Sequence, residues 1–277
     1  MKISSMKAAA LLVATGLFGA NAQAGSIVLT GHDPDFHSAY GESDEIYFNQ
    51  TAISFVMDTL YNSFVASATK FLFVESSIPA PGGHIDGLLG LANSGYVQGV
   101  DFDKADASTL AAKISQLGTT YSALVVASDF GGILTQAELN ILNSNSSNII
   151  NFLNAGGGLY AMAESNTGAG LTPGGGQFGY LPFTTTSVAI GYCGQTTVTA
   201  YGSGEGFQNM HVCADHNYFT GTFGLNVVDF IPGTNEIITL AGRGHTTVTG
   251  VPEPASLLVL GMGLAGIGAS LRKKQKA

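Results

Sequence analysis

Carboxylate and imidazole side chains gather just after several apolar runs of the chain. The densest group is His32-Asp33-Pro34-Asp35-Phe36-His37, which follows the run at 26–30. If the runs are parallel strands of one sheet, their carboxyl ends meet at one edge, where open α/β sheets bind ligands. Glu75 also follows such a run. The candidate ligand-binding residues at this edge are His32, Asp33, Asp35, His37, Asp129 and Glu164.

Metal coordination is one chemistry that such a group can perform. Zinc binds imidazole and carboxylate at about 2.0 to 2.2 Å, and calcium binds mostly oxygen at about 2.3 to 2.6 Å. His32, Asp33 and His37 are therefore candidate ligands of a divalent metal, although their spacing matches no known metal motif. The alternative is structural: the aspartates cap a turn that Pro34 fixes, and the histidines make local hydrogen bonds.

Two other loops carry residues of the same kinds. His84 and Asp86 form one pair, and His211, Asp215 and His216 form a second group. We expect the second group to have a structural role, because a nearby disulfide would hold its loop without an ion.

That disulfide is expected between Cys193 and Cys213, the two cysteines of the chain. An even pair in an oxidising compartment most simply forms a bridge, and closing a loop of about 20 residues would contribute roughly 3 kcal/mol. The alternative is a catalytic thiol, but neither cysteine lies in a sequence that resembles a known nucleophile motif.

The elements that position these residues alternate along the chain. Apolar runs typical of buried strands lie at 26–30, 71–75, 97–102, 123–127 and 159–163. Strands that alternate with helices predict a three-layer α/β sandwich with a mostly parallel, flavodoxin-like sheet. Beyond residue 164 the composition changes, and a β-rich C-terminal extension is expected from the runs at 184–190, 196–201, 236–240 and 246–249.

Helical patterns lie between the predicted strands. Apolar residues recur at spacings of three and four in one segment, at Ile53, Val56, Met57, Leu60 and Phe64. Thr135 and Glu138 form the pattern of a capping box, which opens another helix. Further helices are expected at 85–93, 108–117 and 148–153.

Residues 1–24 have the features of a signal peptide. Lys2 and Lys7 precede an apolar stretch at 8–18, and Ala22-Gln23-Ala24 is a small-x-small cleavage pattern. We therefore expect signal peptidase to act near Gly25 and the following chain to be exported.

The segment 251–277 has a second targeting pattern. Val251-Pro252-Glu253-Pro254 precedes an apolar run at 255–271 and a basic cluster at 272–276. At about 1.5 Å per residue, this run would form a transmembrane helix of roughly 25 Å, enough for a thin bilayer. The basic cluster would stay in the cytoplasm.

This order of Pro-Glu-Pro, apolar helix and basic cluster resembles the PEP-CTERM sorting signal of exosortase systems. The resemblance implies a precursor held in the inner membrane of a Gram-negative bacterium and processed by exosortase near Pro252, Glu253 and Pro254. Delivery to the cell surface or extracellular matrix would follow. The alternative is a C-terminal anchor that is never cut.

The exported part, residues 25–250, is strongly acidic. It holds every acidic residue of the chain except Glu253, 18 in all, against Lys70, Lys104, Lys113 and Arg243, which gives a net charge of −14. Such a surface repels nucleic acid and anionic lipid, so neither is an expected partner. Divalent cations and neutral, hydroxyl-rich molecules, such as an extracellular polysaccharide, fit it better.

Three segments of the domain resemble the class I glutamine-amidotransferase-like superfamily, and within it the trehalose-utilisation-type members. They are Ile-Val-Leu-Thr-Gly-His-Asp at 27–33, Ala-Leu-Val-Val-Ala-Ser-Asp-Phe-Gly-Gly at 123–132 and Asn-Phe-Leu-Asn-Ala-Gly-Gly-Gly-Leu-Tyr-Ala-Met-Ala-Glu at 151–164. True amidotransferases carry a nucleophilic Cys in the turn after the last of these. Here that turn, 163–166, has no Cys, and Ser165 lacks the Gly-x-Ser-x-Gly surroundings of a nucleophile elbow.

The chain therefore divides into a signal peptide (1–24), an exported domain (25–250) and a sorting segment (251–277), and the domain into a parallel core (25–164) and a β-rich extension (165–250). Three functions are compatible with it, and no catalytic residue is assigned. The first is a non-catalytic carbohydrate-binding or matrix-binding domain. The second is a metal-assisted hydrolase of extracellular sugars that uses His32, Asp33 and His37 as ligands or base. The third is a structural subunit of a surface coat.

Overall fold

The computed structural model describes residues 25–76, 87–130, 133–164, 171, 177–190, 194–211 and 216–243. The predicted signal peptide and sorting segment lie outside these residues, as do both cysteines, His84, Asp86 and Asp215.

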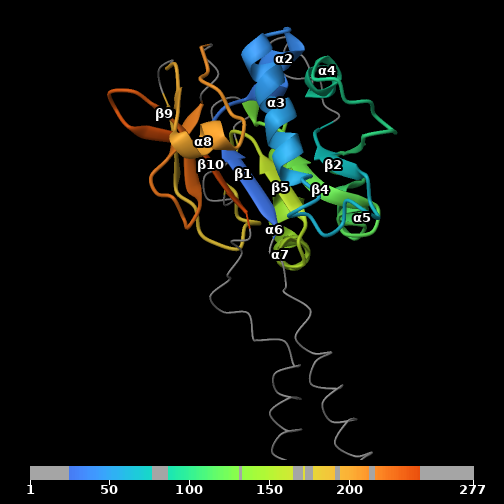
Figure 1. Ribbon diagram of the computed structural model, residues 1–277. Helices are drawn as coiled ribbons and strands as arrows, with labels where there is room; N and C mark the ends of the chain where they lie inside the picture. Colours follow the sequence, from blue (N-terminus) through green and yellow to red (C-terminus); the bar gives the residue numbers. More distant parts are fainter. Residues whose placement is uncertain are drawn as a thin grey trace, which may run out of the picture. The chain divides into compact units, whose positions relative to one another are not determined.

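The first part of the domain alternates strands and helices (Figure 1). Its strands are β1 (Ser26–Thr30), β2 (Lys70–Val74), β3 (Phe102–Ala105), β4 (Tyr121–Val126) and β5 (Gly158–Ala161). Its helices are α2 (Pro34–Ala39), α3 (Ser43–Val56), α4 (Gly87–Asn93), α5 (Leu110–Ile114), α6 (Gln136–Ser144) and α7 (Ser146–Asn154). The later part is rich in strands, as expected, with β6 (Ser187–Ala189), β7 (Thr197–Val198), α8 (Ala200–Gly204), β8 (Asn217–Phe219), β9 (Asn226–Ile231) and β10 (Glu236–Arg243).

The described strands form one sheet, in which β1 lies between a parallel part and a part that begins with an antiparallel strand. The main order is β3-β2-β4-β5-β1-β10-β8-β6, and β9 pairs with both β10 and β7. The strands from β3 to β1 are parallel, whereas β10 runs antiparallel to β1, with Leu29 opposite Leu240. The α/β class is confirmed. The flavodoxin-like arrangement is not, because that sheet has the strand order 2-1-3-4-5.

The hydrophobic core lies on both faces of the parallel strands. Every residue of β1, β4 and β5 is buried, which requires a layer on each side of the sheet. One of these layers includes α3, which packs on β1 and β5 through buried residues such as Phe48, Ala52 and Val56 (Figure 1). Strands buried on both faces give the residues at their carboxyl ends a packed framework.

Two predicted elements differ from those observed. The strand expected at 97–102 is wrong, because residues up to Asp101 form turns in which Gly99 has φ +84°, and β3 begins only at Phe102. The helix expected to reach Phe64 ends at Val56, and Leu60 is 72% exposed. Asn62 stabilises this end by donating hydrogen bonds to the carbonyls of Val56 (2.8 Å) and Ser122 (2.7 Å).

Candidate functional site

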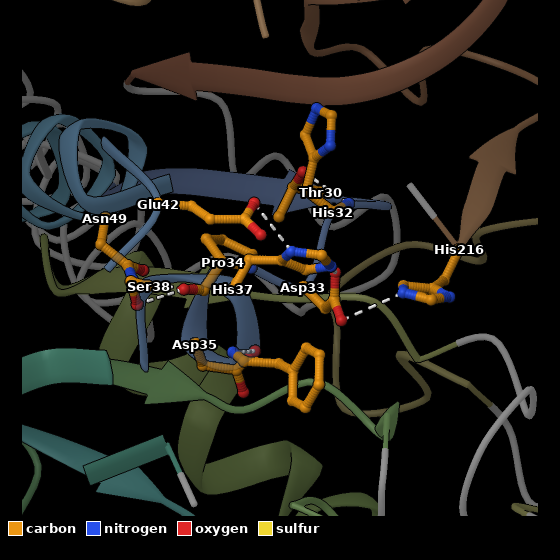
Figure 2. A network of polar contacts seen from close by, with 11 residues as sticks. Thr30, His32, Asp33, Pro34, Asp35, His37, Ser38, Glu42, Asn49 and His216 are labelled. Atoms are coloured by element: carbon orange, nitrogen blue, oxygen red, sulfur yellow. Dashed lines mark hydrogen bonds and ion pairs between the residues drawn. The ribbon is translucent and has the colours of Figure 1, made fainter. Parts of the chain in front are cut away.

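Asp33, His37 and His216 converge at the carboxyl end of β1, and we call them the Asp33 cluster (Figure 2). Asp33 Oδ2 lies 3.0 Å from His216 Nε2, and Asp33 Oδ1 lies 3.6 Å from His37 Nε2. One nitrogen or oxygen atom from each residue lies within 4.8 Å of those of the other two. A metal ion bound by all three residues is compatible with these separations.

The cluster is buried at its carboxylate and open at its imidazoles. Asp33 has no exposed surface, whereas the side chains of His37 and His216 are 17% and 19% exposed. A small ligand can therefore reach the two rings, while the carboxylate behind them stays away from bulk water.

His37 is oriented by a second carboxylate. Its Nδ1 lies 2.9 Å from Glu42 Oε2, which leaves Nε2 directed towards Asp33 (Figure 2). Burial lowers the pKa of His37 below its ordinary value of 6.5, and the negative charge of Glu42 partly offsets this effect. The imidazole is therefore biased towards its neutral form, which is the form that binds metals.

Helix α2, which carries His37, is fixed by a buried hydrogen-bond network. Asn49 of α3 donates to the carbonyl of Pro34 and to Ser38 Oγ, both at 3.0 Å, and accepts from the hydroxyl of Tyr160 in β5 at 3.0 Å. Asn93 of α4 donates to the carbonyl of Ser38 at 2.8 Å. Two helices and a core strand thus hold this short helix in place.

Asp35 anchors the start of the same helix. Its Oδ2 accepts a hydrogen bond from the backbone N–H of Ser128 at 2.8 Å, and its Oδ1 accepts from that of Phe36 at 3.0 Å. Burial raises the pKa of Asp35, and the hydrogen bonds from Ser128 oppose this rise. Asp35 therefore ties α2 to the end of β4 and is not a member of the Asp33 cluster.

His216 reaches the cluster from the residue before β8. Its backbone N–H donates to the carbonyl of Gly31 at 2.7 Å, and its ring stacks on Phe130 with the centroids 4.4 Å apart. A Cβ atom on Gly31 would lie 1.7 Å from the carbonyl oxygen of Asn217, so only glycine permits this approach. Sequence reasoning placed His216 in a separate loop, and nothing in the spacing of the chain indicated its contact with Asp33.

His32 lies elsewhere, although it is adjacent to Asp33 in sequence. Its ring points away from Asp33 (Figure 2), and its Nε2 lies 3.0 Å from Asp229 Oδ2 of β9. Thr196 contacts the same Asp229 oxygen at 3.1 Å. The structure thus brings together Asp33 and His37 of the expected ligand set, places His32 in a buried pair, and supplies His216 as the third residue.

Glu45 of α3 is a buried carboxyl group near this region. Within the described residues, neither of its side-chain oxygens has a hydrogen-bond partner. Burial raises its pKa well above 4.5; the charge of His32 opposes this rise, while the carboxylates of Asp33, Glu42 and Asp229 add to it. The electrostatic surroundings of Glu45 therefore consist mainly of other acidic groups.

Asp129 and Glu164 follow β4 and β5 and are also fully buried. Glu164 accepts hydrogen bonds from the backbone N–H of Phe178 at 2.7 Å and from the hydroxyl of Tyr180. Burial raises the pKa of Glu164 to about 8, with a smaller contribution from Asp129, while the two hydrogen bonds lower it. These residues lie at the predicted edge but are not part of the Asp33 cluster.

The remaining candidates occupy other places. Glu75 Oε1 lies 3.5 Å from the ammonium group of Lys104. His211 is 68% exposed and its Nδ1 pairs with Asp44 at 3.1 Å. Neither joins Asp33, so His211 and His216, which the sequence places in one group, have separate surroundings.

Comparison with known proteins indicates how the chain is sorted. A family model described as the PEP-CTERM protein-sorting motif matches residues 250–274. The motif indicates an exported protein that is sorted by exosortase and anchored transiently in the membrane, which confirms the predicted sorting signal. No curated protein and no solved structure matches the chain, so the resemblance to the amidotransferase-like superfamily has no support.

The motif lies outside the residues that the structure describes, as does the apolar run at 255–271. Among the described helices, none combines the length and the apolar character that crossing a membrane requires.

Proposed function

We propose that the chain is an exosortase-processed protein of the cell surface or extracellular matrix whose domain hydrolyses extracellular sugars at the Asp33 cluster. The sorting motif supports the proposed export and processing. The observation that carries the activity is the convergence of two partly exposed imidazoles on one buried carboxylate.

The chemistry of the cluster suits hydrolysis better than simple adhesion. An imidazole backed by a carboxylate is an arrangement that activates water, and the same groups can bind a metal. Asp129 and Glu164 are fully buried and offer little surface to an extended sugar chain, whereas His37 and His216 of the cluster are partly exposed.

A second candidate is the non-catalytic binding of a carbohydrate or another matrix component. The acidic exported part, with a net charge of −14, suits a neutral, hydroxyl-rich partner.

An incubation of the purified chain with exopolysaccharide distinguishes the two functions. It measures both how much polysaccharide the chain retains and how much reducing sugar is released. Hydrolysis predicts release that falls at least about 100-fold in His37→Ala and His216→Ala. The exposed His211→Ala is the matched control and should keep the full rate.

Retention of the polysaccharide without release would favour the binding function and contradict the hydrolase. Ordered assembly of the chain, with neither retention nor release, would favour a structural coat.

A further inference from the structure

The geometry of the Asp33 cluster points to a specific occupant. We propose that Asp33, His37 and His216 bind a zinc ion through one carboxylate oxygen and two imidazole nitrogens. This inference deepens the proposed function and concerns the same site, but the ion can be tested without a substrate.

The separations between the donor atoms suit a tetrahedral ion. Bonds of about 2.0 to 2.1 Å place tetrahedral ligands about 3.3 Å from one another. The observed separations from Asp33 are 3.0 Å to His216 and 3.6 Å to His37, on either side of that value. The third separation, between the two histidines, is within 4.8 Å and would shorten slightly when the ion binds.

The hydrogen bond between His37 and Glu42 supplies an independent argument. If the Nδ1–H group donates the hydrogen bond to Glu42, then Nε2 of the neutral ring carries a lone pair and no proton. That lone pair faces Asp33 Oδ1 at 3.6 Å, so two electron-rich atoms oppose each other unless a cation lies between them. A carboxylate that holds the far nitrogen of a histidine is also the usual outer support of a zinc ligand.

The charge around the cluster favours a cation as well. The groups that act on buried Glu45 include the carboxylates of Asp33, Glu42 and Asp229, and His32 is the one basic group among its main influences. Both oxygens of Glu45 lack a hydrogen-bond partner within the described residues. A divalent ion bound at Asp33 would offset the negative charges of the Asp33 and Glu42 carboxylates, which contact the two nitrogens of the same imidazole.

The donor set selects zinc over calcium. Two imidazoles and one carboxylate suit zinc and its neighbours in the first transition row, whereas calcium prefers six to eight oxygen ligands. Three protein ligands leave a fourth position for water, which is the pattern of catalytic zinc sites. His37 and His216 are both partly exposed, as a zinc site that admits water requires.

The test uses the full chain, stripped with a chelator and titrated with zinc chloride alone in a calorimeter. We expect one zinc ion per chain. His37→Ala and His216→Ala should each weaken the affinity at least about 100-fold, and Glu42→Gln about 10-fold to 100-fold. His211→Ala, which removes an exposed histidine paired with Asp44, should bind zinc as the unaltered chain does.

Cobalt supplies a second readout that does not depend on activity. Bound Co²⁺ should show the strong visible absorption of tetrahedral coordination in the unaltered chain, and this signal should be lost in His216→Ala. Because both histidines are partly exposed, their variants should fold, and a melting curve of each checks this.

The inference is overturned by zinc binding that is equal in the histidine variants and the unaltered chain, or by a site that accepts only calcium. A chain that binds zinc but releases no sugar would contradict the proposed hydrolase and leave the zinc site standing. Sugar release that continues at the full rate after chelation would support the hydrolase and contradict the zinc site.

Discussion

Single residues of the domain show two ways of burying a carboxyl group. Glu164 and Asp35 receive hydrogen bonds from backbone N–H groups, which compensate part of the cost of burial. Glu45 receives none within the described residues and lies among other acids. The first kind holds structure together, whereas burial raises the pKa of the second kind well above 4.5 and so favours its neutral form.

Glu164 makes the stability of the domain depend on pH. Its pKa is about 8 in the folded state and close to 4.5 in the unfolded chain, so unfolding releases a proton between these values. Raising the pH from about 5 to 8 therefore lowers the free energy of unfolding by about 1 kcal/mol per pH unit from this group. Above pH 8 the contribution is lost and no longer changes.

Glu164→Gln should remove this slope, because glutamine keeps the size of the protonated side chain and does not titrate. Urea denaturation at pH 5, 6, 7 and 8 measures the difference between the two proteins, in which other titrating groups cancel. The gap should close or reverse in favour of the variant as the pH rises. Parallel curves would show that Glu164 is already ionised in the folded state.

Sequence reasoning succeeded at this scale where the contacts are local. Asp33 and His37 are four residues apart, and one turn of α2 brings them to the same side. It did not place His32 or His216, because each meets its partner across the sheet: His32 meets Asp229 of β9, and His216 meets Asp33. No spacing along the chain records such contacts.

At the scale of elements, α2 depends on its neighbours for its position. It has six residues, too few for a stable isolated helix, and it packs against α3 and α4, with Asn49 of α3 linking it to Tyr160 of β5. Asn49 is central, because it satisfies polar groups of both α2 and β5.

Asn49→Ala should lower the free energy of unfolding by about 2 kcal/mol or more, because it leaves the buried Tyr160 hydroxyl without its acceptor and removes one of the two donors to the Pro34 carbonyl. Gln50→Ala is the matched control on the same helix. Its amide is exposed and donates a single hydrogen bond to the carbonyl of Ser94, so about 1 kcal/mol or less is expected. Urea denaturation measures both, and equal losses would contradict the role given to Asn49.

The boundaries of elements were predicted where a local signal sets them. The capping box of Thr135 and Glu138 begins α6 as expected. The end of α3 was not predicted, because the apolar spacing continues past Val56 and the stop comes from Asn62, which bonds to β4 across the fold. The same limit applies to β8 and β9, whose strand pairing depends on β10 and on β6 or β7, all distant from them or separated by loops in the sequence.

The whole domain is organised around β1. Ser26 pairs with Arg243 at one end of this strand, and the Asp33 cluster lies just beyond the other end. The described chain therefore begins and ends at the edge of the sheet opposite the cluster. Apolar runs predicted the parallel strands other than β3, but not the order of the strands, since each run could pair with any other. Nothing in the apolar pattern indicated that β10 lies beside β1.

Arg243 stabilises the end of the sheet opposite the Asp33 cluster. Its guanidinium contacts Asp58 of the segment after α3 at 2.8 Å and Glu205 after α8 at 3.0 Å. The same group lies 3.9 Å from the ring centroid of Phe55 and 4.3 Å from that of Tyr61. Four contacts from one side chain join the end of β10 to both parts of the domain.

Arg243→Ala should therefore lower the free energy of unfolding by about 2 kcal/mol or more, since partly buried ion pairs and stacked rings are lost together. Arg243→Lys should recover less than half of the loss, because a lysine cannot contact two carboxylates and stack between two rings at once. Lys70→Ala is the control: its one ion pair with Asp103 is 28% exposed at the lysine, so less than about 1 kcal/mol is expected.

Zinc affinity measured on the same variants tests whether the contacts of Arg243 affect the Asp33 cluster at the other end of β1. Because β1 separates Arg243 from the Asp33 cluster, Arg243→Ala should lower stability and leave the affinity unchanged under conditions where the chain is folded. A weaker affinity in folded Arg243→Ala would show that the far edge positions the cluster. The contacts of Arg243 would then contribute, through β1, to the geometry of the site that we propose carries the chemistry.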